Sequence, residues 1–243
     1  MLISFHLKRV TLPCLFALTL SCIAWGIPGD RGEKANLRWA EGQSGCTFSA
    51  DDDGKYRYGL WTDDFGIVVA VDADEVRKAS LRIEPLFGVF VTLRYRGKES
   101  LSVNPVDISL EFVDHYHDVQ KAIDPNDFAA KLRDIADTFA EETQREIRRH
   151  PEKKAAQESA LRVYEEDVSE TQQFLKSRSL RPARLDSANS DVSGWVFFSA
   201  KSKWIGDWKK QEQFVLQIPI ADRVIEFPFA LPPSQGDLIL RRR

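Results

Sequence analysis

The segment Asp114–Asp118, with the sequence DHYHD, holds the most closely spaced pair of histidines in the chain. If the strand through Phe112 continues, His115 and His117 point to one face, and two imidazoles at this spacing can bind a metal ion. A tetrahedral site needs further ligands, and no second pair of His or Cys completes the set. A metal-binding protein or metal-dependent enzyme using His115 and His117 is therefore an alternative to the leading hypothesis.

Aspartates in two neighbouring segments raise the question of a calcium site. They are Asp51, Asp52, Asp53, Asp63 and Asp64. Their spacing does not match an EF-hand loop, because it places Leu60 where a bidentate glutamate is required. Asp53-Gly54 is a favoured hairpin pair, so we interpret the triplet as a solvent-exposed turn. A calcium site between these loops stays the alternative.

The common catalytic motifs are missing from the sequence. It contains no Gly-x-Ser-x-Gly elbow, no Gly-rich phosphate loop and no His-Glu-x-x-His helix. Paired acids such as Glu141-Glu142 and Glu165-Glu166 lie in charged helical segments, where neighbouring residues point in different directions. We therefore predict neither an enzyme nor a bound cofactor.

The segment Lys201–Lys210 combines two tryptophans with four lysines around an expected turn at Ile205-Gly206-Asp207. A protruding aromatic and basic tip of this kind suits an anionic partner, a glycan or the membrane interface. In the alternative, one or both rings fold back onto the core while the lysines stay solvated. The candidate binding surface comprises Trp204, Trp208, Lys201, Lys203, Lys209 and Lys210.

Residues 1–26 have the pattern of a signal peptide. Lys8 and Arg9 precede an uncharged apolar run, Val10–Trp25, which is too short for a comfortable membrane span. Small residues at 24 and 26 predict cleavage before Ile27 and export to the periplasm or the cell exterior. An uncleaved signal anchor and lipidation at Cys22 are two alternatives that would tether the chain to a membrane.

Composition and cysteine content limit the classes of partner and the disulfides that are possible. With 34 Lys and Arg against 37 Asp and Glu, the net charge is -3, which gives no electrostatic footprint for nucleic acid. Cleavage would leave Cys46 as the one cysteine, so no disulfide could form within the chain. Cys46 shares strand parity with Phe48, which predicts a buried small hydrophobic residue, with a disulfide between chains as the alternative.

The residues from Leu37 to about Val113 predict a series of short antiparallel strands with turns between them. Asp53-Gly54 separates two of these strands. Within residues 89–95 every second residue is apolar, and a turn follows at Arg96-Gly97-Lys98. Ile108, Leu110 and Phe112 repeat the alternation, with the residues between them facing outward.

The period then changes to that of a helix. Asp124-Pro125 predicts a helix start, with apolar residues at 128, 132, 135 and 139 and an end near Arg149. After His150-Pro151 a second helix follows, with a stripe at 161, 164, 168, 171 and 175 that ends before Arg181-Pro182. Because the two apolar stripes are narrow, we predict an antiparallel helical hairpin with one seam.

Strands resume after the helices, in the runs 194–198, 214–220 and 225–229. Pro219 and Pro228 predict that the last two are edges or strand ends, because proline cannot donate to a ladder. We infer a mainly β, α+β fold with one discontinuous β-sandwich, residues 27–122 plus 185–233. Residues 123–184 are a helical insertion in a connecting loop, and residues 234–243 are a C-terminal tail.

Three segments carry a resemblance to a known family: FGVFVTLRYRG at 87–97, NPVDISL at 104–110 and GWVFF at 194–198. Their succession resembles immunoglobulin-like sandwich domains of unknown function in exported bacterial proteins. The resemblance covers the β portion alone, and the long helical insertion departs from the compact members. It implies a bacterial cell-envelope setting and transfers no catalytic residue.

We therefore expect a non-catalytic binding or scaffold module of the cell envelope. The helical insertion or the tip around Trp204 and Trp208 would contact a protein or glycan partner, with peripheral membrane contact as a further alternative. A purely structural envelope protein is the other alternative. The sequence does not specify the ligand or the oligomeric state.

Overall fold

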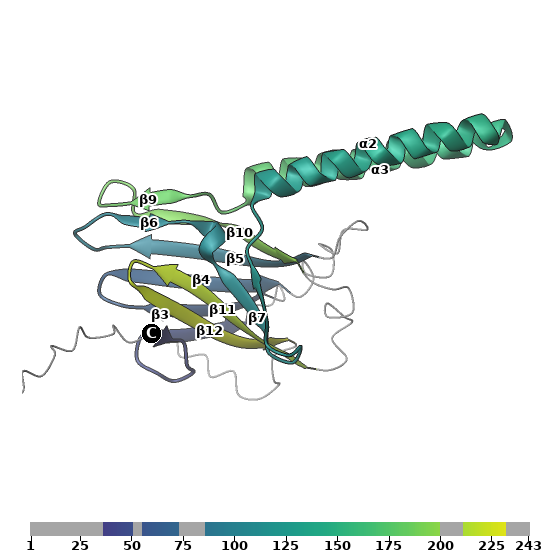
Figure 1. Ribbon diagram of the computed structural model, residues 1–243. Coiled ribbons are helices and arrows are strands. Elements are labelled where there is room, and N and C mark those ends of the chain that lie inside the picture. Colours follow the sequence, from purple (N-terminus) through teal and green to yellow (C-terminus); the bar gives the residue numbers. More distant parts are fainter. Residues whose placement is uncertain (1–35, 51–54, 73–85, 200–210, 232–243) are drawn as a thin grey trace, which may run out of the picture. The chain divides into compact units, whose positions relative to one another are not determined.

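The computed structural model describes residues 36–50, 55–72, 86–199 and 211–231, all within the compact unit Lys34–Arg243 (Figure 1). Predictions for the signal peptide, Cys22, Asp51–Asp53, Lys201–Lys210 and the C-terminal tail fall outside these residues. The described chain is mainly β with two long helices, which confirms the α+β class. The immunoglobulin-like topology and the domain bounds stay predictions.

Two five-stranded sheets form the β portion. The first sheet has the order β1 (Leu37–Arg38), β12 (Arg223–Leu231), β11 (Glu212–Ile220), β7 (Ser109–Phe112) and β8 (Asp118–Lys121). The second has the order β10 (Asp191–Ser199), β5 (Leu86–Tyr95), β4 (Phe65–Asp72), β3 (Lys55–Trp61) and β2 (Cys46–Ala50). Each sheet combines strands from before and after the helices. Pairing is antiparallel except between β1 and β12.

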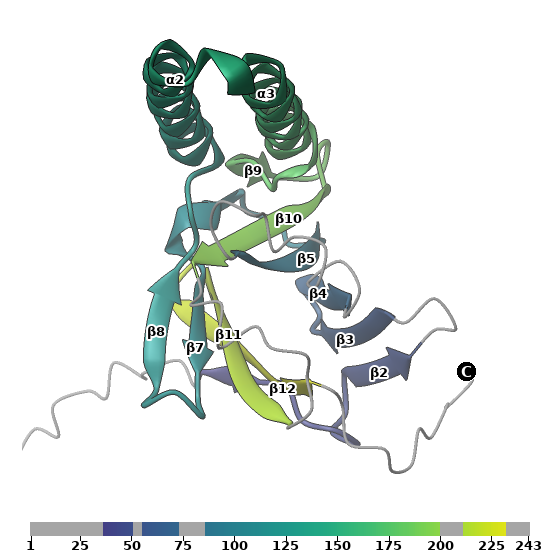
Figure 2. The same cartoon turned by 90° about the vertical axis from the view of Figure 1, so that its right-hand side faces the viewer.

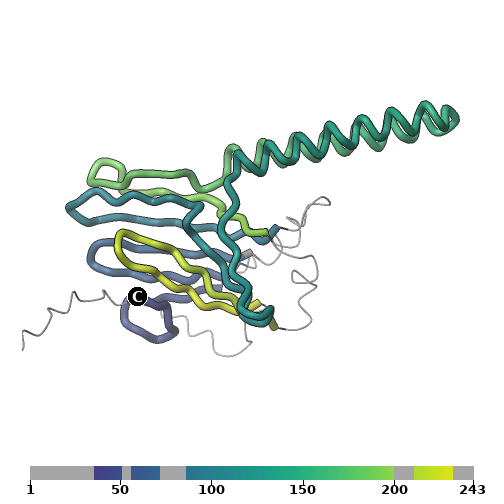
Figure 3. The backbone as a smooth tube through the Cα atoms, in the orientation of Figure 1, coloured from purple at the N-terminus to yellow at the C-terminus, as the bar shows by residue number. Residues whose placement is uncertain are grey.

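Three short elements connect the larger ones. β6 (Leu101–Val103) pairs with β9 (Ala183–Leu185), and η1 (Pro105–Asp107) precedes β7. The helical part consists of α2 (Pro125–Arg149), η2 (Pro151–Lys153) and α3 (Lys154–Arg178). Figure 3 follows the chain from β8 into α2 and back from α3 to β9. No helix in the described part of the chain is long and apolar enough to cross a bilayer.

A single hydrophobic core lies between the two sheets. Its centre is aromatic: the ring of Phe87 on β5 lies 5.1 Å from that of Phe214 on β11 and 6.2 Å from that of Phe112 on β7. The predicted alternation within β5 and β7 is confirmed, because the inward residues of both strands are buried. Cys46 is half-buried and packs against this core, as does Phe48.

The continuous apolar run in β10 has a structural reason. Val196 and Phe198 face the core between the sheets, whereas Trp195 and Phe197 face the base of the helices. A strand covered on both faces needs apolar residues at successive positions rather than alternate ones. β10 therefore joins the core between the sheets to the smaller core beneath the helices.

The helical hairpin is confirmed with the predicted bounds of its first helix. The Asp124 carboxylate accepts hydrogen bonds from the N–H groups of Asn126, at 2.7 Å, and Asp127, at 3.3 Å, and Pro125 is the first helical residue. These are the capping interactions that the first turn of a helix requires. Figures 1 and 2 show α2 and α3 side by side, extending beyond the sheets from β10.

Pro219 and Pro228 predicted edges or strand ends. Neither strand is an edge of the first sheet, whereas Pro219 does lie at the end of β11. β12 lies between β1 and β11, and β11 lies between β12 and β7. The physical reason is local. Pairing of β1 with β12 covers Ile225 and Glu226 and does not reach Pro228, and pairing of β7 with β11 stops before Pro219. Each proline therefore lies where its strand has one paired neighbour in the described chain.

Candidate functional site

The strand through Phe112 does not continue to the histidines, so the condition for the two imidazoles to share a face is not met. The strand ends at Phe112, and residues 113–117 form the turn to β8. The Asp114 carboxylate accepts a hydrogen bond from the N–H of Gln213 on β11, at 2.7 Å, which supplies a partner that the ladder would otherwise provide. Tyr116 and His117 have positive φ angles of 61° and 55°. The chain therefore turns before the two histidines can share a strand face.

The two histidines contact different carboxylates. His115 Nε2 lies 2.6 Å from Glu212 Oε2, with both side chains about one-fifth exposed, beside the ring of Phe112. His117 Nδ1 lies 2.6 Å from Glu111 Oε1 and is 69% exposed. Glu212 has the parity of the core-facing residues of β11, whereas Glu111 has the outward parity of β7. The predicted arrangement of both imidazoles toward one metal ion is therefore not formed.

A metal centre is absent from the described part of the chain. Residues 36–50, 55–72, 86–199 and 211–231 contain no group of three or more His, Cys, Asp or Glu side chains arranged to bind a metal ion. Each histidine of the β7–β8 turn instead has one glutamate as its close ionic neighbour. This geometry serves to fasten the turn to β11 and β7.

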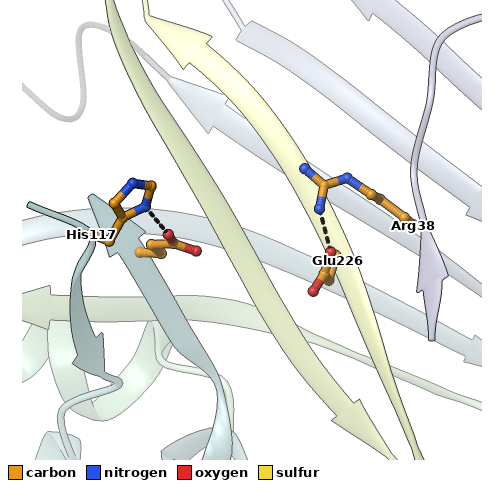
Figure 4. A network of polar contacts seen from close by, with 4 residues as sticks. Arg38, His117 and Glu226 are labelled. Carbon is orange, nitrogen blue, oxygen red and sulfur yellow. Dashed lines mark hydrogen bonds and ion pairs between the residues drawn. The ribbon is translucent and has the colours of Figure 1, made fainter. Parts of the chain in front are cut away.

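A groove of about 430 Å³ crosses the outer face of the first sheet. Val215 and Pro228 lie in its lining, His117 and Glu111 border it on one side, and Arg38 lies on the other (Figure 4). Arg38 Nη1 contacts Glu226 Oε2 at 2.6 Å. Among the described residues, the lining holds no Ser, Thr, Cys or Lys that could act as a nucleophile. Arg38 already has Glu226 as its ion-pair partner, so an anionic ligand would have to displace that carboxylate.

One border of this groove could be predicted from local patterns in the sequence. The alternation in residues 108–112 predicted that Glu111 faces outward. Nothing local predicted that Arg38 meets Glu226, because the two are 188 residues apart and meet through the parallel pairing of β1 with β12. Strand register of this kind is a property of the folded sheet.

The helical hairpin rests on the sheets at its base. Phe128 and Leu132 of α2 and Val168 and Leu175 of α3 form a small core with Leu86 and Phe197 of the second sheet. Leu86, Trp195 and Phe197 lie on the outer face of that sheet, because their neighbours in β5 and β10 face the central core. The base of the hairpin therefore covers one corner of this face.

Both ends of the hairpin are attached to β10. Ile123 donates its backbone N–H to the carbonyl of Phe197, and Leu180 donates its own to the carbonyl of Trp195, each at 2.8 Å. Close approach at the second contact requires Gly194, where an added Cβ would lie 2.5 Å from Leu180 Cα. The hairpin is therefore fixed to the sheet at two neighbouring points.

Beyond its base the hairpin packs mainly on itself. The rings of Phe139 on α2 and Tyr164 on α3 lie 4.6 Å apart, and Thr143 is buried between the helices. A groove of about 340 Å³ runs along the seam, lined by Asp134, Phe139, Tyr164 and their neighbours. Burial raises the pKa of the Tyr164 phenol above its usual value. Among the strands and helices, α2 and α3 contact each other far more than they contact any strand.

Comparisons with known proteins give little further information. No model of a known protein family matches the sequence, and no curated protein matches it significantly. A crystal structure at 2.62 Å resolution of "a putative lipoprotein (ycdA)" from Bacillus subtilis subsp. subtilis str. 168 is similar over 79% of this chain and 40% of that chain. The identity is 12% and the TM-score 0.33. The chain thus spans less than half of that protein, and a likeness this weak supports no conclusion.

Proposed function

We propose that the chain is a non-catalytic binding module of the bacterial cell envelope, in which the helical hairpin contacts a protein partner. In this proposal a signal peptide exports the chain, and the two sheets are an immunoglobulin-like base that holds the hairpin. The tip around Trp204 and Trp208 belongs to the proposed contact surface as a second element. The ligand chemistry of that tip stays a prediction.

The observation that supports this proposal is the division of the hairpin into two parts. Its base contributes buried residues such as Leu132 and Val168 to a core shared with the sheet. The remaining length forms a seam between α2 and α3 with one buried residue, Thr143, and half-buried residues such as Phe139. Helices that serve only stability lay a full apolar face against the domain they stabilise. A long self-packed arm adds surface without adding to the central core, which favours an interaction role.

A shortened hairpin tests the proposal. Residues 137–166 are replaced by a short Gly-Ser turn, which keeps the buried residues of the base core, Phe128, Leu132, Val168 and Leu175, and removes Tyr164 from its edge. We expect the melting temperature to change by a few degrees or less, since the large sheet core is untouched. The readout is the size of the native complex that the epitope-tagged chain forms in envelope extracts.

The two results have opposite meanings. If the intact chain migrates in a complex and the shortened chain migrates as a free protomer, the hairpin carries the contact. If the complex survives the shortening, or if the intact chain forms none, the proposal is wrong and a purely structural role is favoured.

A further inference from the structure

The indole ring of Trp61 lies flat on the outer face of the second sheet. Trp61 ends β3 and is 39% exposed, while Tyr58 and Leu60 of the same strand are buried in the core. A Cβ added to Gly66, opposite Trp61 on β4, would overlap Cε3 and Cζ3 of the ring. A Cβ added to Gly59 would lie 3.0 Å from the indole Nε1. The ring rests on two residues without side chains, with its other face toward solvent.

The sheet surface beside this ring is shallow and has few charges. Register places Val68 and Ala70 of β4 next to Thr92 and Phe90 of β5, and all four are half-buried. Phe90 in turn lies opposite Trp195, with ring centroids 5.5 Å apart.

Two arginines flank the row of residues through Gly59. Arg94, which forms an ion pair with Asp191 at 2.9 Å, lies opposite Gly66 in the row of Trp61, and Arg57 lies opposite Ala70 in the row of Phe90. The base of the hairpin covers the corner at Phe197. The uncharged strip is the row between the two arginines, which runs from Thr47 through Gly59 and Val68 to Thr92 and Ser193.

Polar groups lie beside the indole. Two of them lie over Gly59, which has no side chain: Thr47 Oγ1 and Trp61 Nε1. A Cβ added to Gly59 would overlap the hydroxyl oxygen and would lie 3.0 Å from the indole nitrogen. Thr47 of β2 therefore places a hydroxyl, and Trp61 an N–H donor, over the same point of the sheet. Thr92 and Ser193 add two more hydroxyls along the row through Gly59.

We propose that this face binds a neutral glycan, with Trp61 as the stacking residue. One side of a pyranose ring presents C–H groups that pack on an aromatic face, while its hydroxyls lie at the rim, where hydroxyl and N–H partners are needed. A standard protein interface buries about 800 Å² on each partner around several aromatic or arginine anchors. Among the described residues of this face, Trp61 is the one aromatic residue that is more than a third exposed, and the row beside it consists of smaller side chains such as Val68 and Thr92. The proposal does not depend on the hairpin or on its partner.

Direct titration tests the proposal with three probes: cellohexaose, chitohexaose and maltohexaose. Indole fluorescence and calorimetry of the purified chain follow the binding. We expect saturable binding of at least one probe, with a dissociation constant of about 1 mM or lower, and at least a tenfold loss of affinity in Trp61→Ala. Tyr116→Ala removes a fully exposed aromatic residue from the β7–β8 turn and should bind as the unmodified chain does. Absence of binding to all three probes, or equal binding by Trp61→Ala, overturns the proposal.

A second variant separates stacking from folding. Gly66→Ala keeps the indole but displaces it from the sheet, so the affinity for the bound probe should fall while the far-UV circular dichroism is retained. Retention of full affinity by Gly66→Ala contradicts a flat stacking platform. Sedimentation of the same proteins measures their oligomeric state and shows whether a second copy of the chain, rather than a glycan, binds to this face. Loss of a dimer in Trp61→Ala would make this face a self-association surface and overturn the glycan proposal.

Discussion

Phe139 of α2 and Tyr164 of α3 lie with ring centroids 4.6 Å apart, in the part of the hairpin that packs mainly on itself. The nearest larger core is at the base of the hairpin, where Leu132 is fully buried. The two helices thus combine a base integrated with the second sheet and an arm held by a narrow seam. This difference predicts different responses to substitution along the hairpin.

Phe139→Ala should loosen the arm without unfolding the sheets. Loss of the contact with Tyr164 removes an aromatic pair that typically contributes about 0.5–1.5 kcal/mol beyond its area burial. Hydrogen exchange should become roughly tenfold faster for amides between residues 137 and 166, and remain unchanged in β5 and β11. The rate of global unfolding should be the same in Phe139→Ala as in the original chain. Faster exchange throughout the sheets would contradict a self-packed arm.

Leu132→Ala should instead lower global stability. Leu132 has no exposed surface and packs with Phe128, Val168 and Phe197 at the base. Removing a fully buried leucine side chain typically costs about 3 kcal/mol, because a cavity remains. Val163→Ala on the exposed side of α3 is the matched control and should change stability by about 0.5 kcal/mol or less. Denaturant unfolding measures both, and equal effects would show that the base is not a core.

His115→Ala should be more destabilising than His117→Ala, although each histidine lies 2.6 Å from a glutamate. His115 and Glu212 are mostly covered, so alanine leaves a carboxylate in a poorly solvated place, at a cost of about 1–2 kcal/mol. His117 is 69% exposed, and its loss should cost about 0.5 kcal/mol or less. Chemical unfolding at pH 6 compares the two variants. The reverse order would contradict the assignment of His115 to the edge of the core.

Because the phenol of Tyr58 is buried, we expect the protein to lose stability at alkaline pH. Burial raises the pKa of its phenol above the usual 10.0, and Tyr56 and Glu41 add to the shift. Because the phenolate is favoured in the unfolded chain, the contribution of Tyr58 to stability is complete below pH 10 and is lost as the pH rises above 10. The loss is about 1 kcal/mol for each pH unit. Tyr58→Phe should reduce this slope in unfolding experiments between pH 9 and 11, and an unchanged slope would exclude Tyr58 as its source.

Local patterns predicted much of the secondary structure. Asp124-Pro125 determines the start of α2 through interactions within four residues of the chain, so the sequence alone was sufficient. The alternation in β5 and β7 and the apolar run in β10 likewise depend on neighbouring residues. The bounds of these elements were therefore predictable.

Relationships across the sheets were not predictable in the same way. Trp61 and Gly66 are five residues apart, but the ring lies on Gly66 because β3 and β4 pair in one register. The histidines of the β7–β8 turn were misassigned because Asp114 contacts Gln213, 99 residues further along the chain. A tryptophan with one glycine two residues earlier in its own strand and another at the start of the next strand is a signal that a register prediction could have used.

Site-specific photocrosslinking can show whether the hairpin arm contacts a protein partner. A benzoyl-phenylalanine residue replaces Val163 on α3, and a matched variant carries it at Val119 on β8; the two valines are 44% and 52% exposed. Both proteins are irradiated in intact cells that export the chain. We expect one defined protein adduct from position 163 and none from position 119. No adduct at position 163, or the same adducts from both positions, would contradict it.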